Sequence, residues 1–181
     1  MLATGREPMV TRIRLAWWRE ALERLDREPP PPEPVLQAAA AHVLPTVSGA
    51  NLAAMEEGWA QLVGEGPLSA EQLRAYADKR GGLLFACSAR LLGTSTAVEA
   101  AGARWALVDL ARRSADPKEA AAALAVARSL DEPPSWPRKS RPLGMLSVLA
   151  RRDLDRGTGT WERQGSPARM LRMLRHRLTG R

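Results

Sequence analysis

The sequence predicts an all-α protein, and both its composition and its periodicity support this class. The chain holds only one tyrosine and one phenylalanine and few β-branched residues, so the residue types that favour strands are largely missing. Apolar residues instead recur at helical spacing along most of the 181 residues. A chain of this length can bury one sizeable core, which predicts a single domain over residues 1–181 that ends in a basic linker and helix at 156–181.

The first predicted helix spans residues 8–28 and contains two adjacent tryptophans. Its inward-facing stripe has i, i+3, i+7 and i+10 spacing and consists of Leu15, Trp18, Leu22 and Leu25. Adjacent side chains point about 100° apart on a helix, so Trp17 cannot share this stripe with Trp18. We therefore expect the helix to be flanked on two sides, with a protein partner or a second copy of the chain covering Trp17. The proline run at 29–32 ends the helix.

Prolines, glycines and capping residues divide the rest of the chain into further helices. We expect these helices over residues 34–44, 51–63, 70–92, 97–113, 117–130, 142–155 and 167–178, with loops at 131–140 and 157–165. Ser69 opens a capping box at the start of the 70–92 helix, and Thr96 opens a second one at the next helix. Asp116 is the expected N-cap of the 117–130 helix, with Glu119 reaching back to it.

Two adjacent glycines lie in the middle of the predicted 70–92 helix. Gly81 and Gly82 each destabilise a helix interior by about 1 kcal/mol relative to alanine. Close approach of a second helix is the expected reason, and a kink or a ligand lying against exposed backbone is the alternative. The inward-facing stripe of the same helix includes Tyr76, Arg80 and Cys87.

Positive charge is concentrated at the C-terminal end of the chain. Residues 138–181 contain 12 lysines and arginines but only 3 acidic residues, whereas the rest of the chain is close to neutral. Such a cluster suits nucleic acid, an anionic membrane or an acidic partner, and it also occurs on ordinary solvated faces. We do not expect nucleic acid as a partner, because neither helix-turn-helix spacing nor a series of stacking aromatics accompanies the arginines.

The last predicted helix, 167–178, alternates methionines and leucines with arginines. This basic amphipathic pattern is typical of helices that lie on an anionic membrane surface or dock on a partner. A terminal helix that packs its apolar residues on the bundle and leaves its arginines outside gives the same pattern, and we expect this second arrangement. The sequence has neither a signal peptide nor an apolar run of 18 residues, so we expect a cytoplasmic protein that is at most peripheral to a membrane.

Common catalytic motifs are missing from the sequence. Cys87 is the only cysteine and is expected to be a small buried apolar residue in a reducing compartment. His42 and His176 are far apart without ligand-spaced neighbours, which predicts two surface histidines and no zinc site. No phosphate-binding loop, dinucleotide fingerprint or nucleophile elbow is found. No aspartate pair at i,i+4 spacing is found either, although a helical bundle needs such a pair to hold Mg²⁺ and a diphosphate.

Three segments resemble the squalene/phytoene synthase family. RIRLAWWREALERLD and the following PPPPEPVLQAAAAHVL resemble its arginine- and tryptophan-bearing helix, its proline-rich link and its next helix. EQLRAYADKRGGLLFACSARLLG looks like a later helix, with Tyr76 at the family's tyrosine position, and AAGARWALVDLARR is similar to the helix that carries the second aspartate motif. The resemblance covers most of residues 6–155. It implies a helical bundle of the isoprenoid synthase type, incomplete at the N-terminus.

The departures from the family pattern concern its Mg²⁺-diphosphate motifs. In the alignment, Arg112 falls on the family arginine, Asp109 on an asparagine, and Arg113 on the first aspartate of the second motif. The first motif precedes the tryptophan helix in the family, and we find no counterpart here. Phe85 replaces a glycine and would partly fill the space of a prenyl chain. The degenerate motifs predict no catalytic residue, no metal ligand and no cofactor, except Mg²⁺ if a diphosphate is bound.

Two functions follow from the resemblance. The first is that of a divergent prenyltransferase in isoprenoid biosynthesis, or a fragment of one whose N-terminal part carries the first motif, since the family condenses prenyl diphosphates head-to-head. The second is that of a non-catalytic binding or assembly module, resembling the family's complex I assembly-factor branch. A prenyl diphosphate or another apolar molecule is the expected small ligand. By family position or charge, the candidate binding residues are Tyr76, Arg112, Asp109, Arg12 and Arg19, and the candidate cavity-lining residues are Gly81, Gly82, Phe85 and Trp105.

Overall fold

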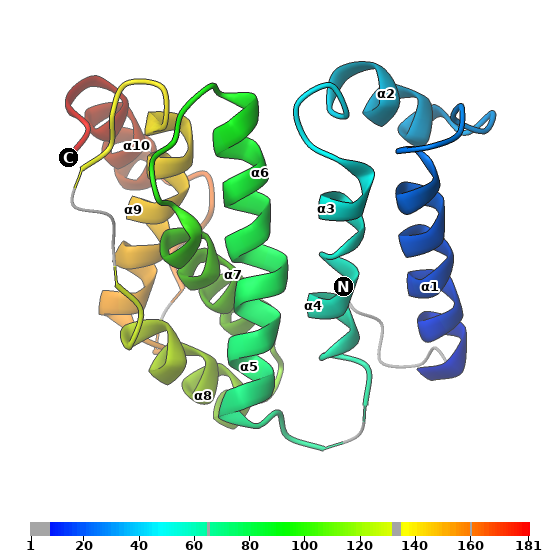
Figure 1. Cartoon of the computed structure of the whole chain (residues 1–181). Coiled ribbons are helices and arrows are strands. Elements are labelled where there is room, and N and C mark those ends of the chain that lie inside the picture. The colour runs from blue at the N-terminus through cyan, green and yellow to red at the C-terminus, as the bar shows by residue number, and fades with distance from the viewer. Residues whose placement is uncertain (1–7, 65, 132–134, 160) are drawn as a thin grey trace.

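The computed structural model describes residues 8–64, 66–131, 135–159 and 161–181, and these residues form helices without any strand. The all-α prediction is thereby confirmed. The helices form two groups that lie side by side (Figure 1). The first group contains α1 (Pro8–Arg24), α2 (Pro34–His42), α3 (Gly49–Ala53) and α4 (Glu56–Ala60). The second contains α5 (Ala70–Tyr76), η1 (Ala77–Gly82), α6 (Leu83–Leu91), α7 (Glu99–Arg113), α8 (Pro117–Arg128), α9 (Arg141–Arg156) and α10 (Pro167–Thr179).

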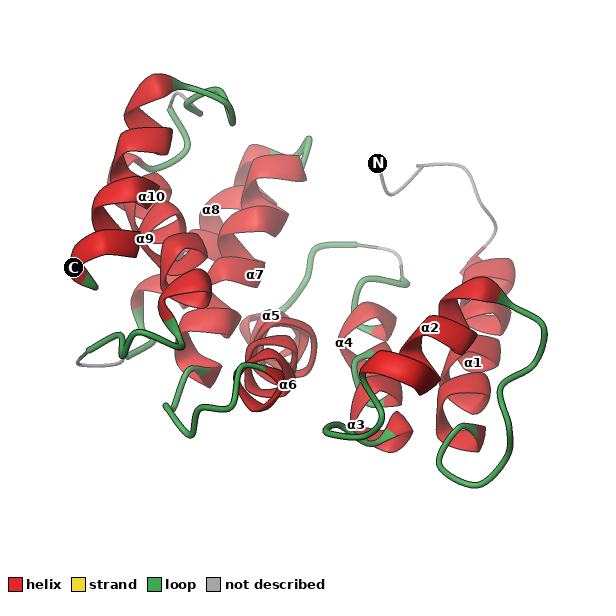
Figure 2. Ribbon diagram, turned by 90° about the horizontal axis from the view of Figure 1, so that it is seen from above, coloured by secondary structure: helices red, strands yellow, loops and turns green. Residues whose placement is uncertain are grey.

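In the first group, α1 packs against α3 and α4, and α2 lies across one end (Figures 1 and 2). The Asp26 carboxylate, just after α1, accepts hydrogen bonds from the backbone N–H groups of Gly49 at 2.6 Å and Ala50 at 2.9 Å. These are the otherwise unpaired donors of the first turn of α3. One carboxylate therefore connects the end of α1 to the start of α3.

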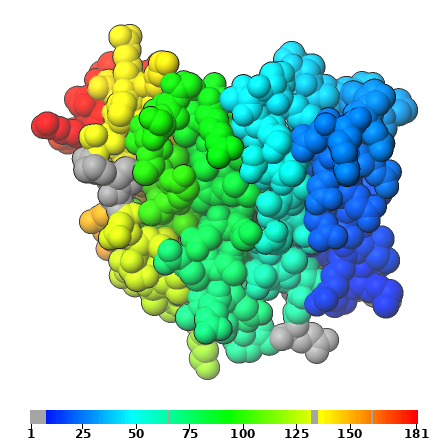
Figure 3. Space-filling view, viewed as in Figure 1, coloured from blue at the N-terminus to red at the C-terminus, as the bar shows by residue number. Residues whose placement is uncertain are grey.

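The single helix predicted over 51–63 is replaced by two short ones, α3 and α4. The first begins earlier than predicted because the Ser48 hydroxyl caps it. The helix is interrupted between α3 and α4 because the N–H groups of Met55 and Gly58 bond to carbonyl oxygens three residues earlier. This turn is tighter than that of an α-helix. A Cβ on Gly58 would lie 2.7 Å from the backbone nitrogen of Arg80. Helix α4 therefore contacts η1 directly, and the space-filling view shows the two groups closed against each other (Figure 3).

The helix predicted over 70–92 is continuous from α5 through η1 to α6. Its capping box is confirmed, because Ser69 accepts from the N–H of Gln72 while the Gln72 side chain accepts from that of Ser69. The middle segment, η1, is a π-helix that contains Arg80 and both glycines. Such wide turns shift the helix face by one position and are frequent at functional sites.

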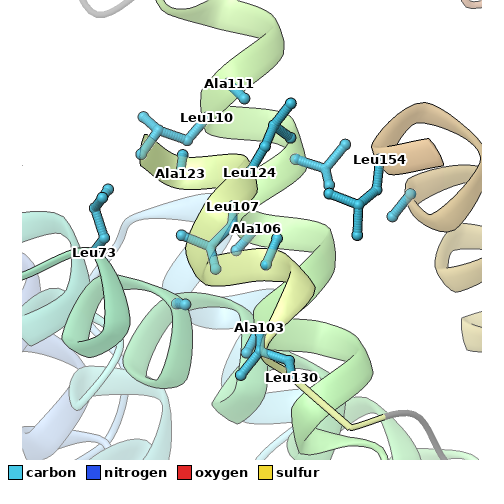
Figure 4. Packing of buried hydrophobic residues seen from close by; sticks show 14 of the residues in the cluster. Leu73, Ala103, Ala106, Leu107, Leu110, Ala111, Ala123, Leu124, Leu130 and Leu154 are labelled. Carbon is cyan, nitrogen blue, oxygen red and sulfur yellow. The ribbon is translucent and has the colours of Figure 1, made fainter. Parts of the chain in front are cut away.

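Helix α7 is the centre of the core, because η1, α8 and α9 all pack on it. Figure 4 shows its leucines and alanines meeting Ala123 and Leu124 of α8 and Leu154 of α9. Alanines on both α7 and α8 allow the two helix backbones to approach closely. Cys87 is buried on α6, as predicted.

The caps of α7 and α8 differ in part from the prediction. The capping box expected at Thr96 is wrong, because its hydroxyl pairs with that of Thr94 and α7 starts after Val98 without a side-chain cap. Asp116 caps α8 as predicted. Glu119 does not reach back to Asp116, because its carboxylate accepts from the Ser114 hydroxyl instead.

Helices α9 and α10 have nearly the predicted bounds, but the predicted face of α10 is wrong. Arg169 and His176 are buried, which also corrects the prediction of a surface position for His176, whereas His42 is exposed as predicted. The methionines and leucines of α10 mostly face outward. Residues 132–134 of the expected 131–140 loop and residue 160 of the 157–165 loop lie outside the described residues. No helix in the described parts of the chain combines the length and the apolar character needed to cross a membrane.

Candidate functional site

Arg80 extends from η1 into the space between α4 and α7. Its guanidinium carbon lies 4.7 Å from the ring centroid of Trp59 on α4 and 4.7 Å from that of Trp105 on α7. The side chain is 13% exposed, and among the described residues its Nε and Nη1 atoms are buried without a hydrogen-bond partner. Two aromatic faces therefore stabilise the largely buried cation, and each such contact is worth roughly 0.5–2 kcal/mol.

Asp109 of α7 lies between two arginines. Its Oδ2 atom is 3.5 Å from Nη2 of Arg80, and its Oδ1 atom accepts a hydrogen bond from Nε of Arg113 at 3.0 Å, one helical turn along α7. The Asp109 side chain is 16% exposed. Its carboxylate charge is thus compensated within the chain.

The two helices that carry these charges touch through their glycines. A Cβ on Gly81 would lie 2.2 Å from the carbonyl oxygen of Gly102 on α7, and a Cβ on Gly102 would lie 2.2 Å from that of Gly81. The expected close approach at the glycine pair is confirmed for Gly81. Gly82 has more space around it, because a Cβ on this residue would lie 3.3 Å from the carbonyl oxygen of Glu99. This backbone contact is what brings Arg80 against α7.

Phe85 fills the next turn beyond this crossing. It is 1% exposed, its ring centroid lies 5.8 Å from that of Trp105, and a Cβ on Gly102 would lie 2.7 Å from its side chain. The candidate cavity-lining residues Gly81, Phe85 and Trp105 are therefore brought together. In the structure Gly81 and Phe85 form packed core, whereas Trp105 also lines a hollow on the side of α7 that faces α9.

Tyr76 lies one turn before Arg80 and is 2% exposed. Its ring meets that of Trp59 edge to face, with centroids 6.2 Å apart. Burial raises the pKa of Tyr76 to about 12, because the phenolate would lose its hydration, and the nearby Arg80 cation only partly opposes this.

We expect the absorbance of the folded protein at 295 nm to titrate with a midpoint near pH 12. Tyr76 is the only tyrosine, so the signal reports this residue alone. The unfolded chain should titrate near pH 10. Since the unfolded state loses its proton first, Tyr76 contributes stability that is complete below about pH 10 and is lost as the pH rises towards 12. The control variant Tyr76→Phe should lose both the absorbance signal and this part of the pH dependence of stability. A titration midpoint near pH 10 in the folded, unmodified protein would contradict the burial of Tyr76.

Arg112, three residues after Asp109 on α7, points towards α9. Its Nη1 atom donates to Asp153 at 3.0 Å, its Nη2 atom donates to the backbone oxygen of Glu162 at 2.9 Å, and its guanidinium carbon lies 5.1 Å from the ring centroid of Trp161. Asp153 also accepts from Arg169 of α10 at 2.5 Å. The buried Asp153 carboxylate of α9 thus binds Arg112 of α7 and Arg169 of α10, and it joins these three helices.

A hollow of about 300 Å³ lies between α7 and α9 beside these groups. Three candidate residues, Trp105, Asp109 and Arg112, line it, together with Arg113 and Asp153. Every charged side chain of this set has an ion-pair partner within the chain. Among the described residues, no three histidine, cysteine, aspartate or glutamate side chains come together in a way that could hold a metal ion.

The two remaining candidates, Arg12 and Arg19, lie on α1 and do not reach α7. Arg12 donates to the backbone oxygen of Val63 at 3.1 Å, and Arg19 lies 3.9 Å from the Glu56 carboxylate. Arg19 borders a second hollow of about 300 Å³ between α1, α3 and α4, with mostly apolar lining that includes Trp18 and Trp59. The structure therefore separates the predicted residues into two places.

The paired tryptophans of α1 have the predicted arrangement. Trp18 faces α3 and α4, whereas Trp17 is 49% exposed, with its ring centroid 4.9 Å from that of Trp18. Met9, Val10 and Ile13 continue the exposed apolar stripe of Trp17 towards the start of α1. Its coverage by a partner or a second copy remains a prediction.

Because these side chains are exposed, we expect the double variant Ile13→Ser/Trp17→Ser to change the free energy of unfolding by less than about 1 kcal/mol. Leu124→Ala, at a position on α8 that is 1% exposed, is the matched comparison and should destabilise by about 2–5 kcal/mol. Urea unfolding followed by circular dichroism measures both. Equal losses in the two variants would mean that α1 packs through its outer face.

Several residues of the site were not predicted from the sequence. The sequence predicts that Arg80 lies on the inward-facing stripe but gives it no role, and a charged residue at such a position is the signal that marks it. Trp59 and Asp153 carry no comparable local signal, because their importance comes from partners on other helices.

The comparisons with known proteins give one match. The model of the squalene/phytoene synthase family matches residues 3–130, a range that includes η1, Tyr76, Arg80, Asp109 and the glycine contact between Gly81 and Gly102. Comparison with the curated proteins and with the solved structures found no match. Since the family model covers more than half of the 181 residues, the chain belongs to the squalene/phytoene synthase family.

Proposed function

We propose that this chain is a non-catalytic member of its family that acts as a helical binding or assembly module. The observation that carries the proposal is the position of Arg80, whose cation is packed between Trp59 and Trp105. A prenyl chain that entered between α4 and α7 would have to displace a largely buried, ion-paired side chain. Displacing it would also separate the cation from both ring faces, which opposes ligand entry.

The charges on α7 also favour binding over catalysis. Mg²⁺ takes oxygen ligands, and prenyl transfer in this family needs carboxylates that face the diphosphates. Arg113 stands at the first aspartate position of the second motif and holds Asp109 at 3.0 Å. The residues present therefore do not fit a Mg²⁺-diphosphate centre on α7. Mg²⁺ would enter only together with a bound diphosphate.

Prenyl transfer is the second candidate, and the family match is the observation that favours it. The two functions differ in one measurement, the Mg²⁺-dependent turnover of farnesyl or geranylgeranyl diphosphate by the full chain. We expect no product above the level of a protein-free control, while an active family member assayed in parallel supplies the positive control. Product formation that depends on Mg²⁺ would overturn the non-catalytic proposal.

Binding of a prenyl diphosphate without its conversion is measured by a separate experiment, the quenching of tryptophan fluorescence. The apolar hollow beside Trp18 and Trp59 suits an apolar molecule, with Arg19 at its rim. We expect farnesyl diphosphate, if it binds there, to quench tryptophan fluorescence, and Leu52→Trp to block the hollow and abolish the quenching. Quenching that persists in Leu52→Trp would place the ligand elsewhere, and equal quenching by farnesol would show that the diphosphate makes no contact with Arg19.

A further inference from the structure

We propose that α10 docks the protein on an anionic lipid surface through an apolar stripe bordered by arginines. The stripe consists of Met170, Leu171, Leu174 and Leu178, with exposed fractions between 55% and 68%. Their i, i+1, i+4 and i+8 spacing places all four on one face of the helix. In two views at right angles, α10 lies at the outer edge of the second group (Figures 1 and 2), where a flat surface can approach it.

The buried face of α10 fixes this orientation. Arg169 is 7% exposed and lies 2.5 Å from the Asp153 carboxylate on α9. His176 is fully buried against Trp136, with ring centroids 5.9 Å apart, and it lies so close to Gly144 that no larger residue would fit there without movement. Turning α10 to bury its leucines would break the buried ion pair and leave a carboxylate without this partner, which is strongly unfavourable. The exposed stripe is therefore a fixed feature of the fold.

The arginines around the stripe suit an anionic surface. On the helix, Arg172 and Arg175 border one side of the stripe and Arg177 borders the other. Among the described residues, none of the three has an acidic partner within ion-pairing distance. Their long stems allow the guanidinium groups to reach lipid phosphates while the leucines enter the boundary between headgroups and acyl chains.

A lipid surface explains the composition of the stripe better than a protein partner does. Protein interfaces concentrate their binding energy in tryptophan, tyrosine and arginine anchors, and leucine is under-represented among them. The exposed face of α10 has no aromatic residue, and the segment 138–181 has an excess of nine positive charges. Leucines beside unpaired arginines are the pattern of helices that lie in the plane of a membrane interface.

Co-sedimentation with vesicles tests the proposal. We expect the full chain to bind phosphatidylcholine vesicles that contain phosphatidylglycerol, and to bind pure phosphatidylcholine vesicles much more weakly. Binding should weaken between about 0.1 M and about 1 M salt, because the screening length falls from about 10 Å to about 3 Å. Arg172→Gln/Arg175→Gln should lower the partition coefficient roughly thirty-fold, at about 1 kcal/mol for each basic residue near an anionic surface. Equal binding to both kinds of vesicle would overturn the proposal.

A second variant tests the contribution of the exposed leucines of α10 to vesicle binding. Leu171→Ser/Leu174→Ser should abolish binding without lowering the thermal midpoint, because both side chains are exposed. The matched control is Ile13→Ser/Trp17→Ser on α1, which removes an exposed apolar stripe elsewhere and should bind like the unmodified chain. Unchanged binding by the leucine variant contradicts the proposal. Light scattering gives a second test. If the unmodified chain is a dimer and only the leucine variant is a monomer, a second copy occupies the stripe, and this result also contradicts the proposal.

A fluorescent label reports whether α10 enters the lipid. Cys87 is buried, so Leu174→Cys can be labelled selectively at position 174 with an environment-sensitive dye. We expect a blue shift of the dye emission on anionic vesicles. The same dye at Lys118→Cys, an exposed position on α8, should show no shift. Equal behaviour of the two positions would overturn docking through α10.

Discussion

Replacing Asp153 by alanine is expected to lower the free energy of unfolding by about 3–5 kcal/mol, because it removes the shared partner of Arg169, which is buried, and of Arg112, which is largely buried. Asp153 is 2% exposed, and its two oxygens lie 2.5 Å from Arg169 and 3.0 Å from Arg112. Without this carboxylate, Arg169 loses its ion-pair partner inside the protein. Urea unfolding followed by circular dichroism measures the loss.

Asp155→Ala is the matched control, two residues further along α9. Its carboxylate is exposed and pairs with Arg151 at 3.4 Å across one helical turn, so its removal should change the free energy of unfolding by less than about 1 kcal/mol. Equal effects of the two alanine variants would mean that the Asp153 cluster does not join α7, α9 and α10. The Asp153 variant should also loosen α10, which limited proteolysis at its arginines would report.

The helices themselves could largely be predicted from the sequence. The capping box at Ser69, the N-cap at Asp116 and the glycine after α9 are local signals, and local signals determine where helices begin and end. The π-turn of η1 is not such a signal. It coincides with the contact between Gly81 and Gly102, and Gly102 lies on a different helix, α7.

The orientation of α10 shows why part of the site could not be predicted. Its apolar residues have the spacing of an inward-facing stripe, and the hydrophobic effect alone would turn them towards the core. Asp153 on α9 opposes this preference, because its second oxygen pairs with the buried Arg169, and turning α10 would break that ion pair. A partner on another helix leaves no mark in the local pattern.

Arg80 illustrates the same limit at the candidate site. Its place on the inward-facing stripe can be read from the 70–92 segment, but the two tryptophans that enclose it come from α4 and α7. Family position directs attention to Tyr76, Asp109 and Arg112 instead. The structure shows that the first two surround Arg80, whereas Arg112 serves the contact with α9.

Replacing Gly102 by alanine is expected to destabilise the protein by about 1–3 kcal/mol or more, because the new methyl group meets backbone on the facing helix. Its Cβ would lie 2.2 Å from the carbonyl oxygen of Gly81 and 2.7 Å from Phe85, so η1 and α7 have to separate. Gly165→Ala is the control. No atom lies within 4 Å of its would-be Cβ, and we expect a change near zero.

The separation should also disturb the site, and this gives the prediction a second measurement. Arg80 and Trp105 lie on the two helices that the methyl group pushes apart, so the cation moves away from one ring face. We expect Gly102→Ala to weaken the near-ultraviolet circular dichroism of the tryptophans and to lower the pKa of Tyr76 from about 12 as water gains access. If Gly102→Ala and Gly165→Ala unfold at the same temperature, the glycine contact does not hold the two helices together, and the enclosed position of Arg80 needs another cause.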